Sequence, residues 1–216
     1  MNFTSIPLLF SAVGVIISVV TLYLTKLRKP KIDVILEHKF LAAYNYDGTV
    51  DFFDMHLPFA IVNTGAAAGV IFRCAANLSS KANPDENYFM NWRWFLRVDE
   101  RYVYDEVVHP FILMGNSSLH KIIYFSWYDQ NKKIKLEPGE YELRFYLWLN
   151  PKINVKPDKI NIHRFNVDET QISELEESLA AAKIGETNPY VEFALDGTKE
   201  GNQLLTEAER KELYDR

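Results

Sequence analysis

The five histidines are the first residues in this sequence to test for chemistry, since imidazole serves both as a metal ligand and as a general base. They are His38, His56, His109, His120 and His163. A zinc site needs Cys or His ligands at short, regular spacings, and none of the five has such a neighbour along the chain. We therefore expect structural roles for the histidines and predict no zinc site.

One segment near the C-terminus, DGTKEGNQLLTE, is similar in part to a calcium-binding loop of the EF-hand kind. Asp196, Gly201 and Glu207 occupy the first, sixth and twelfth positions of such a loop. The residues at the third, fifth and eighth positions match poorly, and Thr206 as a helix cap explains the same pattern without a metal. Asp196 and Glu207 are thus the calcium candidates, while we predict no resident metal or cofactor.

The side chains that act in covalent or acid–base catalysis lack the settings that such chemistry needs. Ser117 and Ser118 miss the flanking pattern of a nucleophile elbow. Cys74, the single cysteine, alternates onto an apolar strand face, where a thiol is buried and inert. Asp105 and Glu106 are adjacent, so on a strand they point to opposite faces and do not converge. The sequence therefore predicts a protein that is not an enzyme.

Four aromatic residues fall on strand faces that point away from the expected core. They are Phe89, Phe95, Tyr146 and Trp148. Exposed aromatic side chains are typical of protein-binding surfaces. We predict an interaction surface for a protein partner here, with the alternative that a helix near the C-terminus covers the same face.

The first element that positions these residues is an uncharged run of 19 residues, from Ile6 to Leu24. At about 1.5 Å of rise per residue, a helix of this length spans about 28 Å, close to the hydrocarbon core of a bilayer. The basic residues Lys26, Arg28, Lys29 and Lys31 follow it, and no charged residue precedes it. The sequence therefore predicts a single-pass protein of the cell membrane, with basic residues at lipid headgroups, the N-terminus outside and the C-terminal domain cytoplasmic.

Small and hydroxyl residues recur along one face of this predicted helix. Ser11, Gly14, Ser18 and Thr21 are spaced by three, four and three positions. Such a stripe lets two helices approach closely, which predicts a homo-oligomer formed through the helix. The alternative is that the hydroxyl groups bond to carbonyl groups of their own helix.

The chain from the basic cluster to Val167 alternates apolar and polar residues, which is typical of half-buried strands. Asp47 and Gly48 form a hairpin signal, and the apolar odd positions from Phe53 to Ile61 form one strand face. About seven or eight short antiparallel strands at this spacing predict a β-sandwich. We therefore divide the chain into an anchor with its basic flank at 1–28, a sandwich at 29–167 and a tail at 168–216.

Two short motifs, LPFAIVNTG and LEPGEYELRF, resemble those of bacterial and archaeal immunoglobulin-like domains. The first has an Asn-x-Gly turn after an early strand, and the second has the Pro-Gly-x-Tyr-x-Leu start of a late strand. The resemblance implies that Tyr141 forms a tyrosine corner and that Leu143 takes the position that antibody domains give to a cysteine. It covers roughly Lys31 to Val167 and implies an immunoglobulin-like antiparallel β-sandwich, but no particular function.

The tail is acidic and begins with helix signals. Asp168 and Gln171 form a capping box, and Val167 with Ile172 is its hydrophobic staple. Residues 168–216 carry 13 acidic and 5 basic side chains, against 16 acidic and 19 basic ones before them. A nucleic-acid-binding protein shows a basic stripe with interleaved aromatic residues, which is missing here, so we predict no nucleic-acid partner.

The fold class that fits these features is mainly β, an antiparallel sandwich between one transmembrane helix and a short helical, acidic tail. The matching function is a non-enzymatic, membrane-anchored interaction or scaffold protein that presents a cytoplasmic β-sandwich to a protein partner. The alternative is a membrane-tethered module that senses a ligand or lipid in an aromatic-lined groove between the sheet and the tail helix. A co-purifying protein would favour the first function, and a bound small molecule would favour the second.

Overall fold

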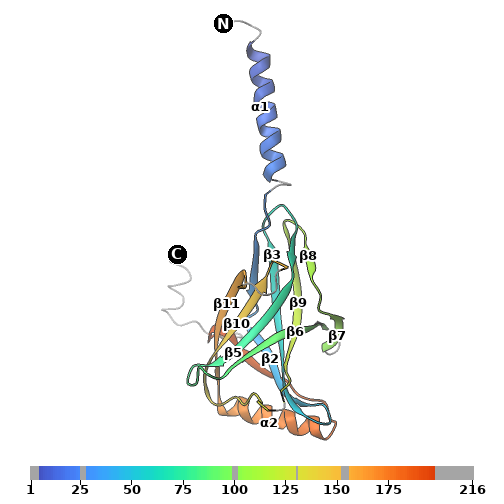
Figure 1. Cartoon of the computed structure of the whole chain (residues 1–216), viewed down its shortest axis with the longest axis vertical. Coiled ribbons are helices and arrows are strands. Elements are labelled where there is room, and N and C mark those ends of the chain that lie inside the picture. The colour runs from blue at the N-terminus through green and yellow to red at the C-terminus, as the bar shows by residue number, and fades with distance from the viewer. Residues whose placement is uncertain (1–4, 25–27, 99–101, 130, 152–155, 198–216) are drawn as a thin grey trace, which may run out of the picture.

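The computed structural model describes residues 5–24, 28–98, 102–129, 131–151 and 156–197, with side chains of the first helix from Ser11 onward (Figure 1). Helix α1 spans Ser5–Leu22 and is followed by strands β1 (Ile32–Leu36), β2 (Lys39–Tyr46), β3 (Asp51–Asn63), β4 (Gly69–Ile71), β5 (Arg73–Ser80) and β6 (Asn87–Val98). Next come β7 (Tyr102–Val107), β8 (Phe111–Leu113), β9 (Ser117–Trp127), β10 (Gly139–Trp148) and β11 (Lys159–Val167). Helix α2 (Glu169–Lys183), strand β12 (Val191–Ala194) and the 3-10 turn η2 (Leu195–Gly197) complete the order.

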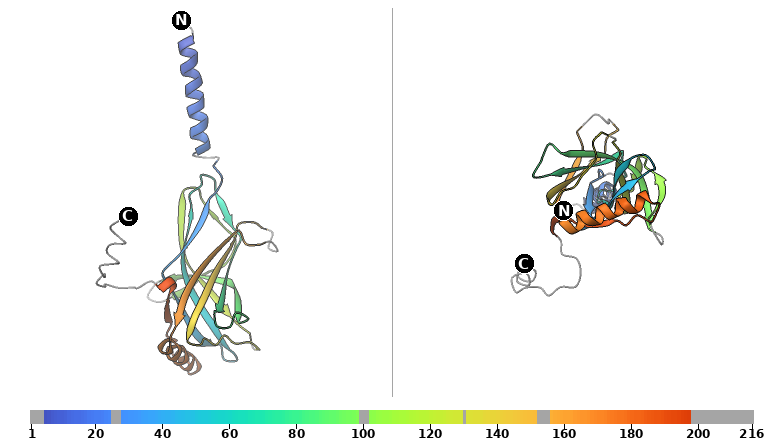
Figure 2. Two further views of the ribbon diagram at one scale, coloured as in Figure 1. Left: turned by 90° about the vertical axis from the view of Figure 1, so that its left-hand side faces the viewer. Right: turned by 90° about the horizontal axis from the view of Figure 1, so that it is seen from below.

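The described strands form one large antiparallel sheet and one small one. The large sheet has ten strands in the order β11-β10-β5-β6-β9-β3-β2-β12, with β1 added to β3 and β7 to β6, while β4 pairs with β8. The long strand β3 connects these parts, because its first half pairs with β2, its second half with β1 and its other edge with β9. The large sheet curls round on itself, as the two views of Figure 2 show. The buried apolar residues form one core cluster inside it.

The interior is filled by large apolar side chains that alternate along the strands. The inward face of β3 is at most 1% exposed at Phe53, Met55, Leu57, Phe59 and Ile61. Phe145 of β10 packs against this face, with its ring centroid 5.8 Å from that of Phe59. Burying one such side chain contributes about 1.5–3 kcal/mol, so this cluster is a main source of stability for the curled sheet.

Helix α1 falls short of the predicted transmembrane helix. It ends at Leu22, and a wider turn at Tyr23 and Leu24 follows, with the N–H of Arg28 donating to the carbonyl oxygen of Tyr23 (2.8 Å). No helix among the residues described is long and apolar enough to cross a membrane. The predicted single-pass anchor, with an outer N-terminus and a cytoplasmic domain, is therefore wrong.

The predicted fold class also needs correction, from an immunoglobulin-like sandwich behind a membrane anchor to a mainly β protein with one curled antiparallel sheet. The immunoglobulin-like assignment is not confirmed. One local feature of the resemblance is present, because the hydroxyl oxygen of Tyr141 accepts a hydrogen bond from the N–H of Glu137 (2.8 Å), four residues upstream. Tyr141 thus makes the hydrogen bond that is typical of a tyrosine corner, although the strands around it are arranged differently from those of an immunoglobulin-like sandwich.

The segment after Val167 belongs to the same fold. Helix α2 begins at the predicted capping box, in which the carboxylate of Asp168 accepts from the N–H of Gln171 (2.8 Å). The helix lies across the end of the sheet opposite α1 (Figures 1 and 2). Strand β12 then pairs with β2 and ends the sheet order, so the β-rich unit continues past residue 167 to Ala194.

The two ends of the sheet order meet along a seam that side chains close. Nδ1 of His163 on β11 is 2.6 Å from Oδ2 of Asp196 in η2, and the N–H of Arg164 donates to Oδ1 of the same carboxylate (2.9 Å). Farther along β11, the side-chain amide of Asn161 donates to the carbonyl oxygen of Val34 on β1 (2.8 Å). Strand β11 therefore has a backbone ladder with β10 on one edge and this side-chain seam on the other.

Candidate ligand-binding site

Three aromatic residues on neighbouring strands form the floor of an apolar pocket. The hairpin register places Tyr44 of β2 opposite Phe53 of β3, and the next register places Phe53 opposite Trp127 of β9. Residues directly opposite one another on paired strands share a face of the sheet, so these three side chains lie side by side. The ring centroids of Tyr44 and Phe53 are 6.0 Å apart.

The pocket lies between this floor and helix α2 and has a volume of about 230 Å³. Leu179 of α2 and Ile134 of the loop between β9 and β10 complete its apolar walls. Its charged lining residues are Asp51, Lys133, Lys135 and Glu176. An apolar cavity with a few polar groups is the usual form of a small-molecule site.

The loop between β9 and β10 is held over the pocket by two of the floor residues. The hydroxyl oxygen of Tyr44 accepts from the N–H of Leu136 (2.7 Å), and the indole N–H of Trp127 donates to the carbonyl oxygen of Lys132 (2.5 Å). Burial is the main cause that raises the pKa of Tyr44 to about 12. The phenol therefore stays protonated at neutral pH and keeps an O–H donor at the pocket.

Helix α2 is fixed over the pocket by buried contacts with β2. Leu175 and Ser178 are both 0% exposed. The hydroxyl of Ser178 donates to the carbonyl oxygen of Tyr44 (2.9 Å), and the side-chain amide of Asn188 donates to the same oxygen (3.1 Å). Losing such a bond to a buried polar group costs about 1–3 kcal/mol, so α2 is a firm wall of the pocket.

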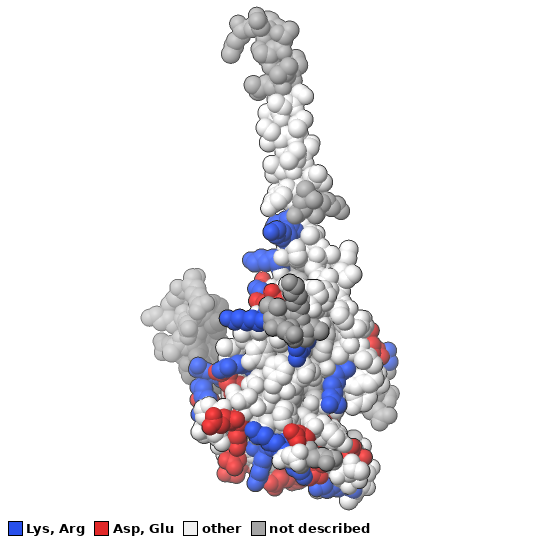
Figure 3. All heavy atoms as spheres, viewed as in Figure 1, with Lys and Arg blue, Asp and Glu red and all other residues white. Residues whose placement is uncertain are grey.

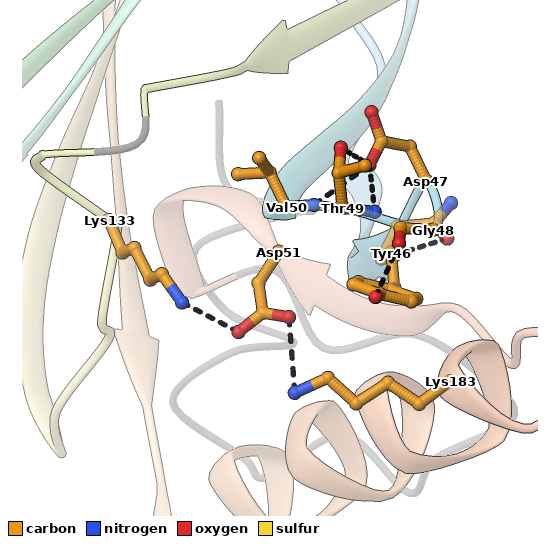
Figure 4. Close-up of polar contacts among 9 residues, drawn as sticks. Tyr46, Asp47, Gly48, Thr49, Val50, Asp51, Lys133 and Lys183 are labelled. Carbon is orange, nitrogen blue, oxygen red and sulfur yellow. Dashed lines mark hydrogen bonds and ion pairs between the residues drawn. The ribbon is translucent and has the colours of Figure 1, made fainter.

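A second, open hollow of about 650 Å³ adjoins the pocket, because Asp51 and Lys133 line both. In Figure 4 the carboxylate of Asp51 lies between two ammonium groups, with Nζ of Lys133 2.7 Å from Oδ2 and Nζ of Lys183 3.1 Å from Oδ1. The hydrogen bond from Lys133 is the largest cause that lowers the pKa of Asp51, so this carboxylate is ionised at neutral pH. Charged side chains of both signs gather at this end of the molecule (Figure 3).

The turn between β2 and β3 holds Asp51 in place. Oδ1 of Asp47 accepts from the N–H groups of Thr49 and Val50 (2.8 Å each), which closes the turn (Figure 4). Gly48 takes a φ of +97°, which only glycine adopts without strain. The first strand residue after this rigid turn is Asp51, whose position is therefore set by the predicted hairpin.

Three of the four predicted surface aromatic residues lie together, on the outer face of β5, β6 and β10. Phe89 is 40% exposed, and its ring centroid is 5.8 Å from that of Tyr146, which lies 6.1 Å from that of Trp148. The guanidinium group of Arg73 lies over the indole of Trp148, 4.7 Å from its centroid, and Trp148 is 6% exposed. Helix α2 packs on β2 instead of on this group.

Phe95 lies apart from these three residues, in the core. It is 1% exposed, and its ring centroid is 5.7 Å from that of Phe111. The register of β6 with β9 shifts between Trp92 and Trp94, so that Arg93 is an extra residue on β6. Such a β-bulge inverts the alternation that follows it, which turns Phe95 inward.

The residues predicted around α1 make mostly local contacts. Ser11, Gly14, Ser18 and Thr21 are all exposed. The hydroxyl of Ser18 donates to the carbonyl oxygen of Gly14 (2.8 Å), which is the alternative of bonding within the helix.

The basic cluster after α1 lies against the end of the sheet. The guanidinium group of Arg28 donates to the carbonyl oxygen of Thr64, and the backbone N–H of Lys31 donates to Oδ1 of Asn63 (3.1 Å). Lys29 is exposed, and Lys26 lies outside the described residues.

Of the two calcium candidates, the structure describes Asp196 alone. At the seam, Oδ1 of Asp196 accepts from the N–H of Arg164, and Oδ2 contacts Nδ1 of His163. Glu207 lies outside the described residues. Within the ranges that the structure describes, no group of three or more His, Cys, Asp or Glu side chains is placed to hold a metal ion.

Sequence analysis did not single out Tyr44, Trp127 or the two lysines of the site. The hairpin signal at Asp47 and Gly48 could have placed Tyr44 opposite Phe53. Lys133 and Lys183 come from a loop and a helix that are far apart in sequence, and no local pattern relates them to Asp51.

No known protein-family model matches this chain, and no curated protein matches its sequence. Two bacterial proteins are among the solved structures with a low-scoring similarity to this chain. A candidate lipoprotein, ycdA, of Bacillus subtilis has a TM-score of 0.38 and 12% identity over 71% of this chain and 42% of its own. A β-glucosidase involved in saponin metabolism from intestinal bacteria has a TM-score of 0.30 and 17% identity over 65% of this chain and 16% of its own. This chain thus spans less than half the length of either protein, and neither likeness says what it binds or does.

Proposed function

We propose that this protein is a non-enzymatic binding module that holds a small molecule in the pocket between α2 and the sheet. The observation that carries the proposal is the pocket itself, which combines a floor of Tyr44, Phe53 and Trp127 with a few charged lining residues. Because these three side chains are held on paired strands, the apolar floor is in place before a ligand binds.

The size of the pocket limits the ligand to one ring or a short chain. A cavity of about 150 Å³ with apolar walls is large enough for benzene, and this pocket has about 230 Å³. Burying six carbon atoms contributes about 5 kcal/mol at about 0.8 kcal/mol each, before the cost of association. We therefore expect dissociation constants of about 0.2 mM or weaker for an apolar probe of six carbon atoms.

Filling the pocket from helix α2 tests this function. In the full-length protein, Leu179→Trp places a large side chain from α2 toward the floor, and Ala180→Trp places the same side chain on the exposed neighbouring position. Binding of 1-octanol is measured by calorimetry, and thermal unfolding confirms that each variant folds. We expect the wild type and Ala180→Trp to bind equally and Leu179→Trp to lose at least about tenfold in affinity. Equal affinity in all three proteins, or no binding by the wild type, would overturn the proposal.

The outer aromatic group favours a second candidate function, binding of an acidic protein segment. Phe89 is 40% exposed beside Tyr146, and the exposed Arg144 and the half-buried Arg73 lie on the same outer face. Aromatic and arginine side chains are enriched where proteins bind one another. A Phe89→Ser variant should release a co-purifying protein with little change in stability, whereas unchanged co-purification would exclude this face.

A further inference from the structure

We infer that the ligand of the pocket is a monocarboxylate, whose apolar part fills the pocket and whose carboxylate binds the ammonium groups of Lys133 and Lys183. The inference rests on the proposed function and adds the chemical class of the ligand. The two lysines come from the β9–β10 loop and from the last turn of α2, and both reach the hollow at the mouth of the pocket.

The structure already holds one carboxylate in the geometry that the ligand would use. Each oxygen of Asp51 contacts a different ammonium group, Lys133 at 2.7 Å and Lys183 at 3.1 Å (Figure 4). An ammonium group has three N–H donors, and Asp51 uses one on each lysine. The remaining donors can bind a second carboxylate in the open hollow, through charge-assisted hydrogen bonds.

The charge at this place favours an anion. The charged residues that line the two hollows are Lys133, Lys135 and Lys183 against Asp51 and Glu176, which leaves one positive charge in excess. A cationic group would meet Asp51 already neutralised by two ammonium groups. An anionic group instead meets the ammonium groups of Lys133 and Lys183, which contact only one carboxylate between them, that of Asp51.

The head and the tail of one small molecule can occupy the two hollows together. Asp51 and Lys133 line both, so the polar hollow begins where the apolar pocket ends. The pocket of about 230 Å³ suits a short acyl chain or an aryl ring, and the hollow of about 650 Å³ leaves the carboxylate in contact with water. A partly hydrated carboxylate avoids the cost of full desolvation.

A matched pair of probes separates the anion from the chain. Octanoate and 1-octanol share their chain and differ in the head, and acetate supplies the head alone. By calorimetry on the full-length protein at low salt, we expect octanoate to bind at least about tenfold more tightly than 1-octanol and about a hundredfold more tightly than acetate. Equal binding of acetate and octanoate would overturn the inference, because the pocket would then add nothing.

Substitutions at the mouth test the residues. Lys133→Gln with Lys183→Gln should bring the affinities for octanoate and 1-octanol to within about twofold of each other. Asp51→Asn, which frees both ammonium groups, should tighten octanoate binding at least about threefold and leave 1-octanol unchanged. Lys81→Gln, which removes a lysine paired with Glu140 outside the site, is the control and should change neither affinity.

The outcomes distinguish this inference from the proposed function. If octanoate and 1-octanol bind equally and Leu179→Trp blocks both, the pocket stands and the carboxylate site is wrong. If neither probe binds the wild type, the proposed function fails and the inference fails with it. A loss of octanoate binding in Lys81→Gln equal to that in the double lysine variant would also overturn the site.

Discussion

The phenol of Tyr124 donates a hydrogen bond of 2.5 Å to Oδ1 of Asp54, whose side chain is 1% exposed. The side-chain amide of Asn45 donates to the other oxygen (3.0 Å). Burial is the main cause that raises the pKa of Asp54 to about 6. His56 follows on the same face of β3 at 4% exposed, and burial lowers its pKa to about 4. The sheet therefore buries an acid and a base side by side.

These two groups give opposite pH dependences of stability. Asp54 has a folded pKa above its unfolded value, so its contribution is present below about pH 4 and is lost as the pH rises through about 6. His56 has a folded pKa below its unfolded value, so its contribution is present above about pH 6.5 and is lost as the pH falls through about 4. Between these limits the two effects largely cancel in the wild type.

In the variant Asp54→Asn, the pH dependence of stability that His56 causes should no longer be cancelled. Relative to the wild type, we expect this variant to lose about 3 kcal/mol more of its free energy of unfolding when the pH falls from about 6.5 to about 4. Urea unfolding at several pH values measures it, and His56→Gln should deviate in the opposite direction. Parallel pH profiles for the wild type and Asp54→Asn would show that the carboxyl group titrates normally.

Asn63 connects three segments at the end of the sheet near α1. Its side chain is 0% exposed, and its Oδ1 accepts from the N–H groups of Lys31 (3.1 Å) and Gly65 (2.9 Å). Its Nδ2 donates to the carbonyl oxygens of Ala67 (2.9 Å) and Met114 (3.1 Å). The side chain thus satisfies backbone groups from both sides of the turn and from the segment after β8.

Asn63→Ala should lower the free energy of unfolding by about 3 kcal/mol or more, because several backbone groups lose their partner at once. Asn63→Asp keeps the acceptors but loses both donors and adds a buried charge, so we expect a similar loss at neutral pH. Asn87→Ala, at an exposed position, is the control and should change stability by less than about 0.5 kcal/mol. If Asn63→Ala lowered the free energy of unfolding by less than about 0.5 kcal/mol, the proposed role of the Asn63 side chain would be contradicted.

The turn at Gly65 leaves no room for a side chain. A Cβ there would overlap the carbonyl oxygen of Lys29 and lie 2.6 Å from Cα of Pro30, and both are backbone atoms. We expect Gly65→Ala to lower the free energy of unfolding by at least about 2 kcal/mol in denaturant titrations. Gly14→Ala, where a Cβ meets nothing within 4 Å, should be neutral or slightly stabilising, and equal effects of the two would contradict the packing.

The thiol of Cys74 should be silent in the native protein. It is 0% exposed, and burial raises its pKa well above the usual value, so the reactive thiolate is scarce. We expect no modification by a thiol reagent in buffer and full modification of one thiol per chain in denaturant, with rates that follow unfolding. Rapid labelling of the folded protein would contradict the burial of this strand face.

The strand patterns predicted the inward face of β3 and the β2–β3 hairpin, since both depend on residues close in sequence. An apolar face at the odd positions of β3 implies an outer, polar face at the even positions, yet Asp54 and His56 at those positions are buried. Part of their cover is Tyr190, whose ring centroid lies 4.2 Å from that of His56 and which comes from the segment before β12. Alternation describes a strand but not what a distant segment lays over it.

The remaining differences have equally physical causes. The bulge at Arg93 turned Phe95 inward, and bulges leave little trace in a sequence of aromatic residues. The uncharged run before Lys26 has the composition of a membrane span, but the helix that it forms ends at Leu22. The sequence offered only an alternative prediction here, an aromatic-lined groove between the sheet and the tail helix. The lysines of the site were not predicted, because their positions depend on how α2 packs against the sheet.

The seam at Asp196 decides whether β11 is a free edge. A strand edge with open N–H and C=O groups is a template that recruits strands from other molecules. The carboxylate of Asp196 accepts a hydrogen bond from the N–H of Arg164 on this edge (2.9 Å). This N–H is therefore not open to pairing with a strand of another molecule. Loss of that one carboxylate would therefore favour aggregation between molecules, even where each molecule keeps its own core intact.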